Sequence, residues 1–195
     1  SFDFVNFTGS VSGGKIIEQA AAGTFTGVGT ELGGKDPGYV MEDADLDVSV
    51  ETLIDGAMFN CGQCCCGIER IYVVESLYDE FIEKAVKIVS GYKLGNPLEE
   101  DTTIGHMAHK RFAQEVRGQI AEAIADGATP LINTFPEDDG EAYLTPQILT
   151  NVTHDMRVMR DETFGPLVGI MKVKDDGEAI ELMNDSDFGL TASLW

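Results

Sequence analysis

The chain has 195 residues, and its 34 Asp and Glu against 13 Lys and Arg give a formal net charge of -21. This balance excludes an electrostatic nucleic-acid binder, because such proteins cluster basic residues along phosphates, and an anionic membrane surface would repel the chain as well. The hydrophobic content of 43% suits a soluble globular protein. No apolar run approaches the roughly 20 residues of a spanning helix, and the amino end lacks a signal-peptide pattern. We therefore expect a cytoplasmic protein; the excess of acid is also a feature of proteins adapted to high salt.

Strand-like and helix-like segments alternate along the chain. Strands are predicted where β-branched and aromatic residues cluster or alternate, at 2–8, 24–32, 39–41, 68–74, 129–133, 143–149, 167–173 and 191–195. Helices are predicted where apolar residues recur at helical spacing, at 12–22, 44–60, 77–90, 106–126 and 177–183. This alternation is typical of an α/β layer protein with a largely parallel sheet. Both ends of the chain lie in apolar strands, which favours a piece of a longer protein.

A glycine-rich turn, GSVSGGKI, joins the first predicted strand to the first predicted helix at residues 9–16. Its spacing matches a GxxxxGK phosphate loop except at Ile16, where a Ser or Thr hydroxyl should hold Mg²⁺. Backbone amides at a helix N-terminus also bind other anions. Three interpretations stay open: a turn that approaches a phosphate or nicotinamide group, a loop that binds a nucleoside triphosphate, and a tight turn without a ligand.

The cysteines crowd into six positions, at Cys61, Cys64, Cys65 and Cys66. A catalytic cysteine acts as a thiolate, and flanking glycines allow backbone amides to approach a developing oxyanion. Buried inert thiols, a redox pair and a metal site are the alternatives. The Cys61-x-x-Cys64 spacing is half of a zinc site, but no second half follows, so no metal site is predicted.

Two further motifs carry carboxylates. Glu31 ends a predicted strand and precedes a Gly-Gly turn, a position from which a side chain can enter a ligand cleft at the carboxyl edge of a sheet. A solvated loop carboxylate is the alternative. In ETFGP, Glu162 and Phe164 precede another strand; they could hold a ribose hydroxyl and a flat ring, or only fasten a loop.

Together these motifs resemble the aldehyde dehydrogenase superfamily. Five of its patterns occur in the family's order, as FTGS at 7–10, ELGGK at 31–35, FNxGQxC at 59–65, ExFGP at 162–166 and NxxxxGL at 184–190. The resemblance implies oxidation of an aldehyde to a carboxylic acid through a thiohemiacetal and a thioester. It makes Cys65 the nucleophile, with Cys64 and Cys66 lining the substrate pocket, and Glu31 the general base for the hydrolytic water.

The resemblance also implies NAD or NADP as cofactor, with no metal. Glu162 and Phe164 match positions that hold the nicotinamide ribose and ring, and Gly9 and Ser10 match the turn that approaches the cofactor. The parent enzyme is expected to be a homo-oligomer.

The implied fold is a three-layer αβα catalytic domain with a largely parallel sheet, truncated at both ends. Residues 1–33 correspond to the end of the dinucleotide-binding domain, and residues 34–195 to an incomplete catalytic domain. Because family members are more than twice as long, we expect little dehydrogenase activity from these residues alone. A non-catalytic structural fragment with buried thiols is the rival interpretation.

Overall fold

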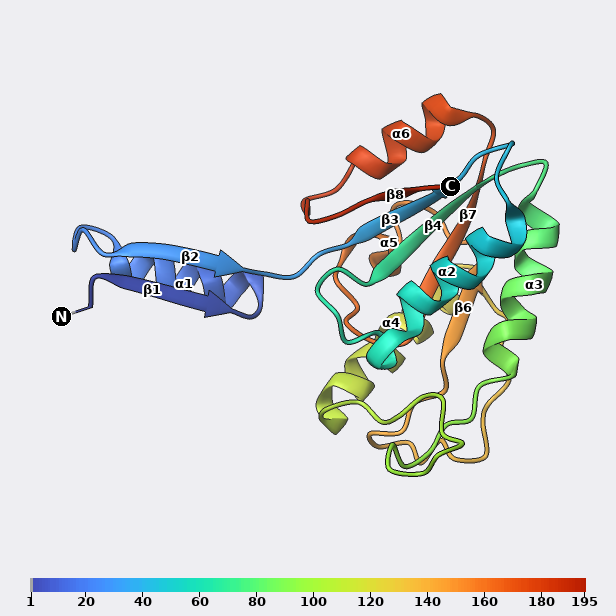
Figure 1. The fold of residues 1–195 in the computed structure, drawn as a ribbon, viewed down its shortest axis with the longest axis horizontal. Coiled ribbons are helices and arrows are strands. Elements are labelled where there is room, and N and C mark those ends of the chain that lie inside the picture. Colours follow the sequence, from blue (N-terminus) through green and yellow to red (C-terminus); the bar gives the residue numbers. More distant parts are fainter. Residues whose placement is uncertain (1) are drawn as a thin grey trace.

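A computed structural model describes residues 2–195. A small β-α-β unit projects from a larger α/β body (Figure 1). In the small unit, β1 (Phe4–Thr8) and β2 (Gly27–Glu31) pair in parallel, and α1 (Val11–Ala21) connects them. The next strand, β3, belongs to the larger body, so the predicted boundary after residue 33 falls in the connection between two separate sheets. The assignment of residues 1–33 to a dinucleotide-binding domain stays a prediction.

The large sheet has six strands in the order β5-β6-β7-β4-β3-β8. Their bounds are β3 Asp36–Val40, β4 Ile68–Val74, β5 Thr129–Pro130, β6 Gln147–Thr150, β7 Leu167–Val173 and β8 Ser193–Leu194. Every neighbouring pair is parallel except β5 with β6. The central strands β4 and β7 are buried almost throughout, as expected for parallel strands covered on both faces.

Helices cover both faces of this sheet, which confirms the three-layer α/β architecture. They are α2 Leu46–Met58, α3 Tyr78–Ser90, α4 Lys110–Ala125, α5 Arg157–Arg160 and α6 Asp176–Asn184. Successive residues of a strand point to opposite faces. On β4, Tyr72 packs with α4, α5 and α6, whereas Ile71 and Val73 pack with α2 and α3. None of the helices among residues 2–195 is both long and apolar enough to cross a lipid bilayer.

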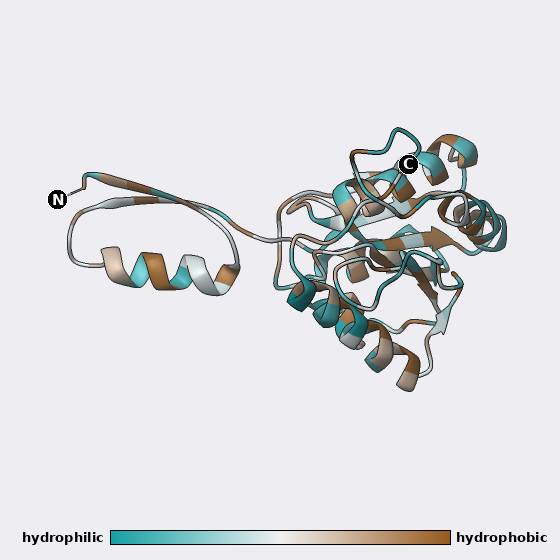
Figure 2. Cartoon of the chain, turned by 90° about the horizontal axis from the view of Figure 1, so that it is seen from below, coloured by the Kyte–Doolittle hydropathy of each residue, from teal (hydrophilic) through white to brown (hydrophobic). Residues whose placement is uncertain are grey.

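Apolar residues also lie on the strands and helix of the small unit (Figure 2). Several of them are exposed, including Phe4 at 57% and Ile16 at 64%. A two-stranded sheet with one helix buries too little apolar surface to hide them all.

Several predicted bounds were wrong. The helix expected at 106–126 begins at Lys110, because His109 is its N-cap and accepts a hydrogen bond from the Arg111 amide. The strand expected at 143–149 is confined to 147–150. The short helix α5 was not predicted, since four residues are too few for a periodic pattern.

Candidate active site

The ELGGK, cysteine and ETFGP motifs converge at the amino ends of three adjacent strands. Lys35 directly precedes β3, Cys65 lies three residues before β4, and Glu162 and Phe164 precede β7. These strands are neighbours in the order β7-β4-β3 and run parallel, so the segments that enter them meet at one edge of the sheet. The topology therefore brings three distant motifs together.

The small sheet contributes the carboxyl ends of its two parallel strands, β1 and β2. Glu31 ends β2, and the amide of Gly9, just after β1, donates a hydrogen bond of 3.0 Å to the Glu31 carbonyl. The structure thus places the predicted cofactor turn beside the predicted base. The Glu31 side chain is exposed, and only residues 32–35 separate it from the edge of the large sheet.

The glycine-rich turn after β1 starts a helix. α1 begins at Val11, and the Ser10 hydroxyl caps it by accepting a hydrogen bond from the Gly13 amide at 3.1 Å. Residues 11–15 are helical, so their amides are directed along the helix axis instead of surrounding one phosphate, and Lys15 is exposed. The interpretation as a triphosphate-binding loop was therefore wrong. The free amides of the first turn still favour an anionic group nearby.

A left-handed turn carries the cysteine motif. Asn60, Cys61 and Gly62 follow one another with φ of 52°, 58° and 67°. This conformation costs roughly 1–2 kcal/mol for a residue with a Cβ, so surrounding contacts must hold it. A Cβ on Gly62 would lie 2.1 Å from the Gly165 carbonyl oxygen, which shows how closely the turn packs on the ETFGP loop. The Gln63 side chain adds two bonds, accepting from the Ala108 amide at 2.7 Å and donating to the Asn60 carbonyl at 3.2 Å.

The four thiols differ in burial, and two of them have raised pKa values. Cys61 is buried, and desolvation raises its pKa to about 12. The pKa of Cys66 is raised to about 11, first by its hydrogen bond with Cys64, whose Sγ lies 3.5 Å away. Both thiols are therefore protonated near neutral pH and poor nucleophiles. Cys64 and Cys65, each half-buried, are left as candidates. None of the four forms a disulfide, and residues 2–195 hold no group of three or more His, Cys, Asp or Glu suited to a metal ion.

The Gly-Gly turn of ELGGK fits between the other motifs. A Cβ on Gly34 would lie 2.6 Å from the Cys65 carbonyl oxygen, and one on Gly33 would lie 2.2 Å from Glu162 Oε1. The Gly34 amide donates to the same Glu162 oxygen at 3.3 Å. Gly34 meets a backbone oxygen that cannot rotate away, so the approach at this position requires a residue without a side chain, whereas Gly33 meets the movable end of the Glu162 side chain. Burial raises the pKa of Glu162, and the charge of Glu69 adds to the effect.

Phe164 has φ of 48° and exposes 40% of its surface. It borders an open cavity of about 530 Å³, together with Asn60, Gln63 and His106. One aromatic ring is thus available to a flat ligand beside the cysteine turn.

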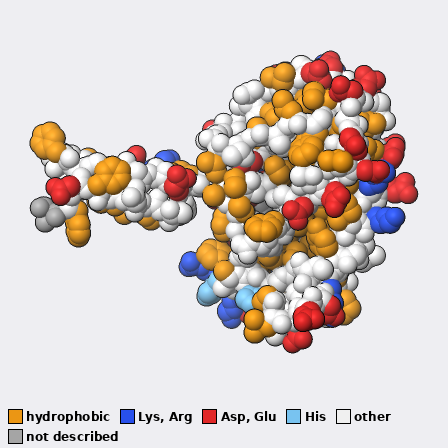
Figure 3. All heavy atoms as spheres, viewed as in Figure 1, with side chains coloured by type: hydrophobic (Ala, Val, Ile, Leu, Met, Phe, Trp, Pro, Cys, Tyr) orange, Lys and Arg blue, Asp and Glu red, His pale blue; other side chains and the backbone are white. Residues whose placement is uncertain are grey.

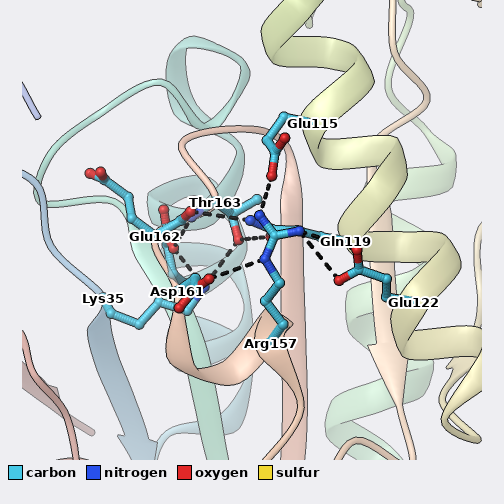
Figure 4. Close-up of polar contacts among 9 residues, drawn as sticks. Lys35, Glu115, Gln119, Glu122, Arg157, Asp161, Glu162 and Thr163 are labelled. Carbon is cyan, nitrogen blue, oxygen red and sulfur yellow. Dashed lines mark hydrogen bonds and ion pairs between the residues drawn. The ribbon is translucent and has the colours of Figure 1, made fainter.

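Sequence reasoning missed the polar side chains that support this site, some of which Figure 4 shows. Arg157 on α5 forms ion pairs with Asp161, Glu115 and Glu122, and so joins the start of the ETFGP loop to α4. Gln119 is fully buried on α4 and bonds to the same loop. No local pattern marks these residues, because their partners are far away in the chain.

Glu69 and Arg70 did leave a signal, as adjacent charges in an otherwise apolar buried strand. The Arg70 guanidinium donates to the carbonyls of Leu182 and Met183 at the end of α6 and to that of Lys35. Arg70 thus stabilises the C-terminus of α6, where carbonyls lack helical partners. Glu69 faces the site instead.

Comparison with known proteins identifies the family of this chain. The model of the aldehyde dehydrogenase family matches residues 1–195. Lactaldehyde dehydrogenase of Escherichia coli (strain K12) is 36% identical over 192 residues, which are 98% of this chain and 40% of that protein.

The fold is also similar to that of two solved structures. A 3,6-anhydro-L-galactose dehydrogenase in complex with NAP matches with a TM-score of 0.94 and 37% identity, over 98% of this chain and 41% of that one. Betaine aldehyde dehydrogenase from Staphylococcus aureus in complex with NAD+ matches with a TM-score of 0.93 and 34% identity, over 99% of this chain and 39% of that one. The chain therefore spans about 40% of the length of such relatives, and it belongs to the aldehyde dehydrogenase family.

Proposed function

We propose that the protein containing this chain oxidises an aldehyde to a carboxylic acid, with Cys65 as the nucleophile and NAD(P)⁺ as the cofactor. The observation that carries the proposal is the meeting of three motifs at one sheet edge, where Gly34 contacts the Cys65 carbonyl and Gly33 contacts Glu162. Cys61 and Cys66 are poor nucleophiles because their pKa values are raised. The family resemblance favours Cys65 over Cys64.

Cys65 acts in two stages. Its thiolate attacks the aldehyde carbonyl, and the resulting oxyanion requires preorganised donors, one of which is the Cys65 backbone amide. After oxidation, the sulfur holds the acyl group as a thioester. Glu31 then takes a proton from the water that hydrolyses this thioester. The short connection from β2 to β3 supports this role, because Gly34, three residues after Glu31, packs against the Cys65 carbonyl.

The residues present fit NAD(P)⁺, which when bound supplies the hydride acceptor. Glu162 offers a half-buried carboxylate that can accept hydrogen bonds from ribose hydroxyls, and Phe164 offers an exposed ring face. Gly9 and Ser10 stand at the start of α1, where free amides favour a phosphate. The relatives solved with NAP and NAD+ support the same cofactor class.

Ester hydrolysis tests the nucleophile without the cofactor. In the complete encoded protein, Cys65→Ala is expected to lower turnover of p-nitrophenyl acetate by at least about 100-fold, because it removes the attacking atom. Cys64→Ala is the matched control, since it removes a neighbouring thiol of similar exposure and should keep turnover within about threefold of wild type. Loss of turnover in Cys64→Ala with retention in Cys65→Ala would show that Cys65 is not the nucleophile. A wild-type protein with no turnover would favour the structural-fragment interpretation.

A further inference from the structure

Glu69 is a buried carboxylate on β4 that the reaction outlined above does not use. Its side chain is only 6% exposed, and all three of its partners are donors. Oε1 accepts from the Phe164 amide at 2.8 Å, and Oε2 accepts from the Thr163 amide at 2.8 Å and from Lys35 Nζ at 2.7 Å. One carboxylate therefore holds two consecutive amides of the ETFGP loop.

This clamp acts where the backbone is strained. Phe164 has φ of 48°, a conformation that costs a bulky residue of order 1–3 kcal/mol and persists only when neighbouring contacts enforce it. The Glu69 bond to the Phe164 amide is a charge-assisted one, about twice as strong as a bond between neutral groups. Glu69 thus holds the amide of the residue whose backbone is strained.

Lys35 supplies the positive charge that makes a buried carboxylate tolerable. Its ammonium group also donates to Thr163 Oγ1 at 3.0 Å, so Lys35 and Glu69 hold the same residue from both its side chain and its amide. Burial lowers the pKa of Lys35, while its ion pair with Glu69 opposes this shift. The pair links ELGGK to ETFGP directly.

The α4 layer holds the loop from its other side. Thr163 Oγ1 donates to Gln119 Oε1 at 2.7 Å, and Gln119 Nε2 donates to the Glu162 carbonyl at 3.2 Å (Figure 4). Between these supports, the Glu162 carboxylate turns toward Gly33 and Gly34, and the Phe164 ring borders the open cavity.

We propose that Glu69 is a positioning residue for the cofactor: it holds the Thr163 and Phe164 amides so that the Glu162 carboxylate and the Phe164 ring face the nicotinamide ribose and ring. This inference rests on the proposed function, because it needs NAD(P) to bind at Glu162 and Phe164. Glu69 itself touches neither cofactor nor substrate.

Glu69→Gln in the complete protein tests this role. The substitution keeps the side-chain shape, but its NH₂ group must face a backbone amide or the Lys35 ammonium, each of which is itself a donor. In a fluorescence titration, the dissociation constant for NADPH or NADH, whichever the wild type binds, is expected to rise about tenfold or more. The KM for the oxidised cofactor should rise in parallel. Hydrolysis of p-nitrophenyl acetate through Cys65 should stay within about threefold of wild type.

Tyr39→Phe is the matched control. It removes a partly buried hydrogen bond of another strand in the same sheet, the 2.7 Å bond between the Tyr39 hydroxyl and Asp176 Oδ1. It should lower the thermal midpoint but leave cofactor affinity unchanged. If Glu69→Gln also leaves the dissociation constant within twofold of wild type, the positioning role is wrong.

A second variant covers the case in which Glu69→Gln does not fold. Glu69→Asp keeps the charge for Lys35 but is too short to reach both amides, so it should weaken cofactor binding at least about threefold, with ester hydrolysis retained. Unchanged binding in a folded Glu69→Asp would equally overturn the inference. A wild-type protein that neither hydrolyses the ester nor binds NAD(P)H would instead contradict the proposed function.

Discussion

Replacing Gly62 by Ala tests the packing of the cysteine turn on the ETFGP loop. The new Cβ would lie 2.1 Å from the Gly165 oxygen, 2.2 Å from the Gly165 carbonyl carbon and 2.8 Å from the Pro166 nitrogen. These are backbone atoms, which cannot rotate away as a side chain can. The left-handed conformation adds roughly 1 kcal/mol for Ala, and the displacement of packed backbone about 1–3 kcal/mol, so we expect a loss of about 2–4 kcal/mol.

Two other glycines separate these contributions. Gly140 has φ of 72°, close to that of Gly62, with no atom within 4 Å of its added Cβ, so Gly140→Ala carries the conformational cost alone, about 1–2 kcal/mol. Gly118 lies inside α4 with equal space around it, and Gly118→Ala should gain roughly 0.5–1 kcal/mol from helix propensity.

Urea unfolding followed by far-ultraviolet circular dichroism ranks the three variants of the complete protein. The shift in midpoint equals the change in unfolding free energy divided by the slope, so Gly62→Ala, which has the largest expected loss, should show the largest fall in midpoint. We expect Gly118→Ala at or above wild type, Gly140→Ala below it, and Gly62→Ala lowest. Equal midpoints for Gly62→Ala and Gly140→Ala would show that the approach to Gly165 adds nothing, and a wild-type midpoint for Gly62→Ala would refute the left-handed turn itself.

Two further predictions concern charge. Burial tends to raise the pKa of Asp138, but hydrogen bonds from Thr145 and Gly140 and the charge of Arg117 lower this pKa overall. The ionised Asp138 therefore stabilises the folded protein above its ordinary pKa of 3.8. This stabilisation is lost as the pH falls through the lower pKa of the folded state. Asp138→Asn should therefore destabilise the protein by about 1–3 kcal/mol at pH 7, and in urea titrations this deficit should shrink below pH 3.8; a deficit that is constant with pH would contradict the assignment. The second prediction follows from the excess of 34 acidic over 13 basic residues, with acidic side chains dispersed over the face in Figure 3. Raising KCl from about 0.1 to 1 M shortens the screening length from about 10 to 3 Å, which weakens the repulsion between carboxylates and should raise the thermal midpoint. A falling midpoint would mean that favourable ion pairs outweigh this repulsion.

Strong periodic patterns predicted the main elements well. The bounds of β4 and β7 agree with the prediction, and α3 differs by one residue at its start, because Phe81, Ala85 and Val89 mark one buried face. The left-handed turn at 60–62 could not be predicted, since Asn60 tolerates that conformation without requiring it, Cys61 ordinarily avoids it, and the contacts that support it come from the distant residues Gly165 and Ala108.

The local sequence was enough to identify the α/β alternation, the family motifs and the candidate nucleophile, because each depends on a short run of neighbouring residues. The partners of Glu69 are not: Lys35 and Thr163 lie 34 and 94 positions away, and only the parallel order β7-β4-β3 brings their segments to one edge. A charged residue in a buried strand contradicts the local hydrophobic pattern until its partners are known. Tertiary structure decides such a contact, because burying a charge is tolerable only where strand pairing delivers an opposite charge and donors together.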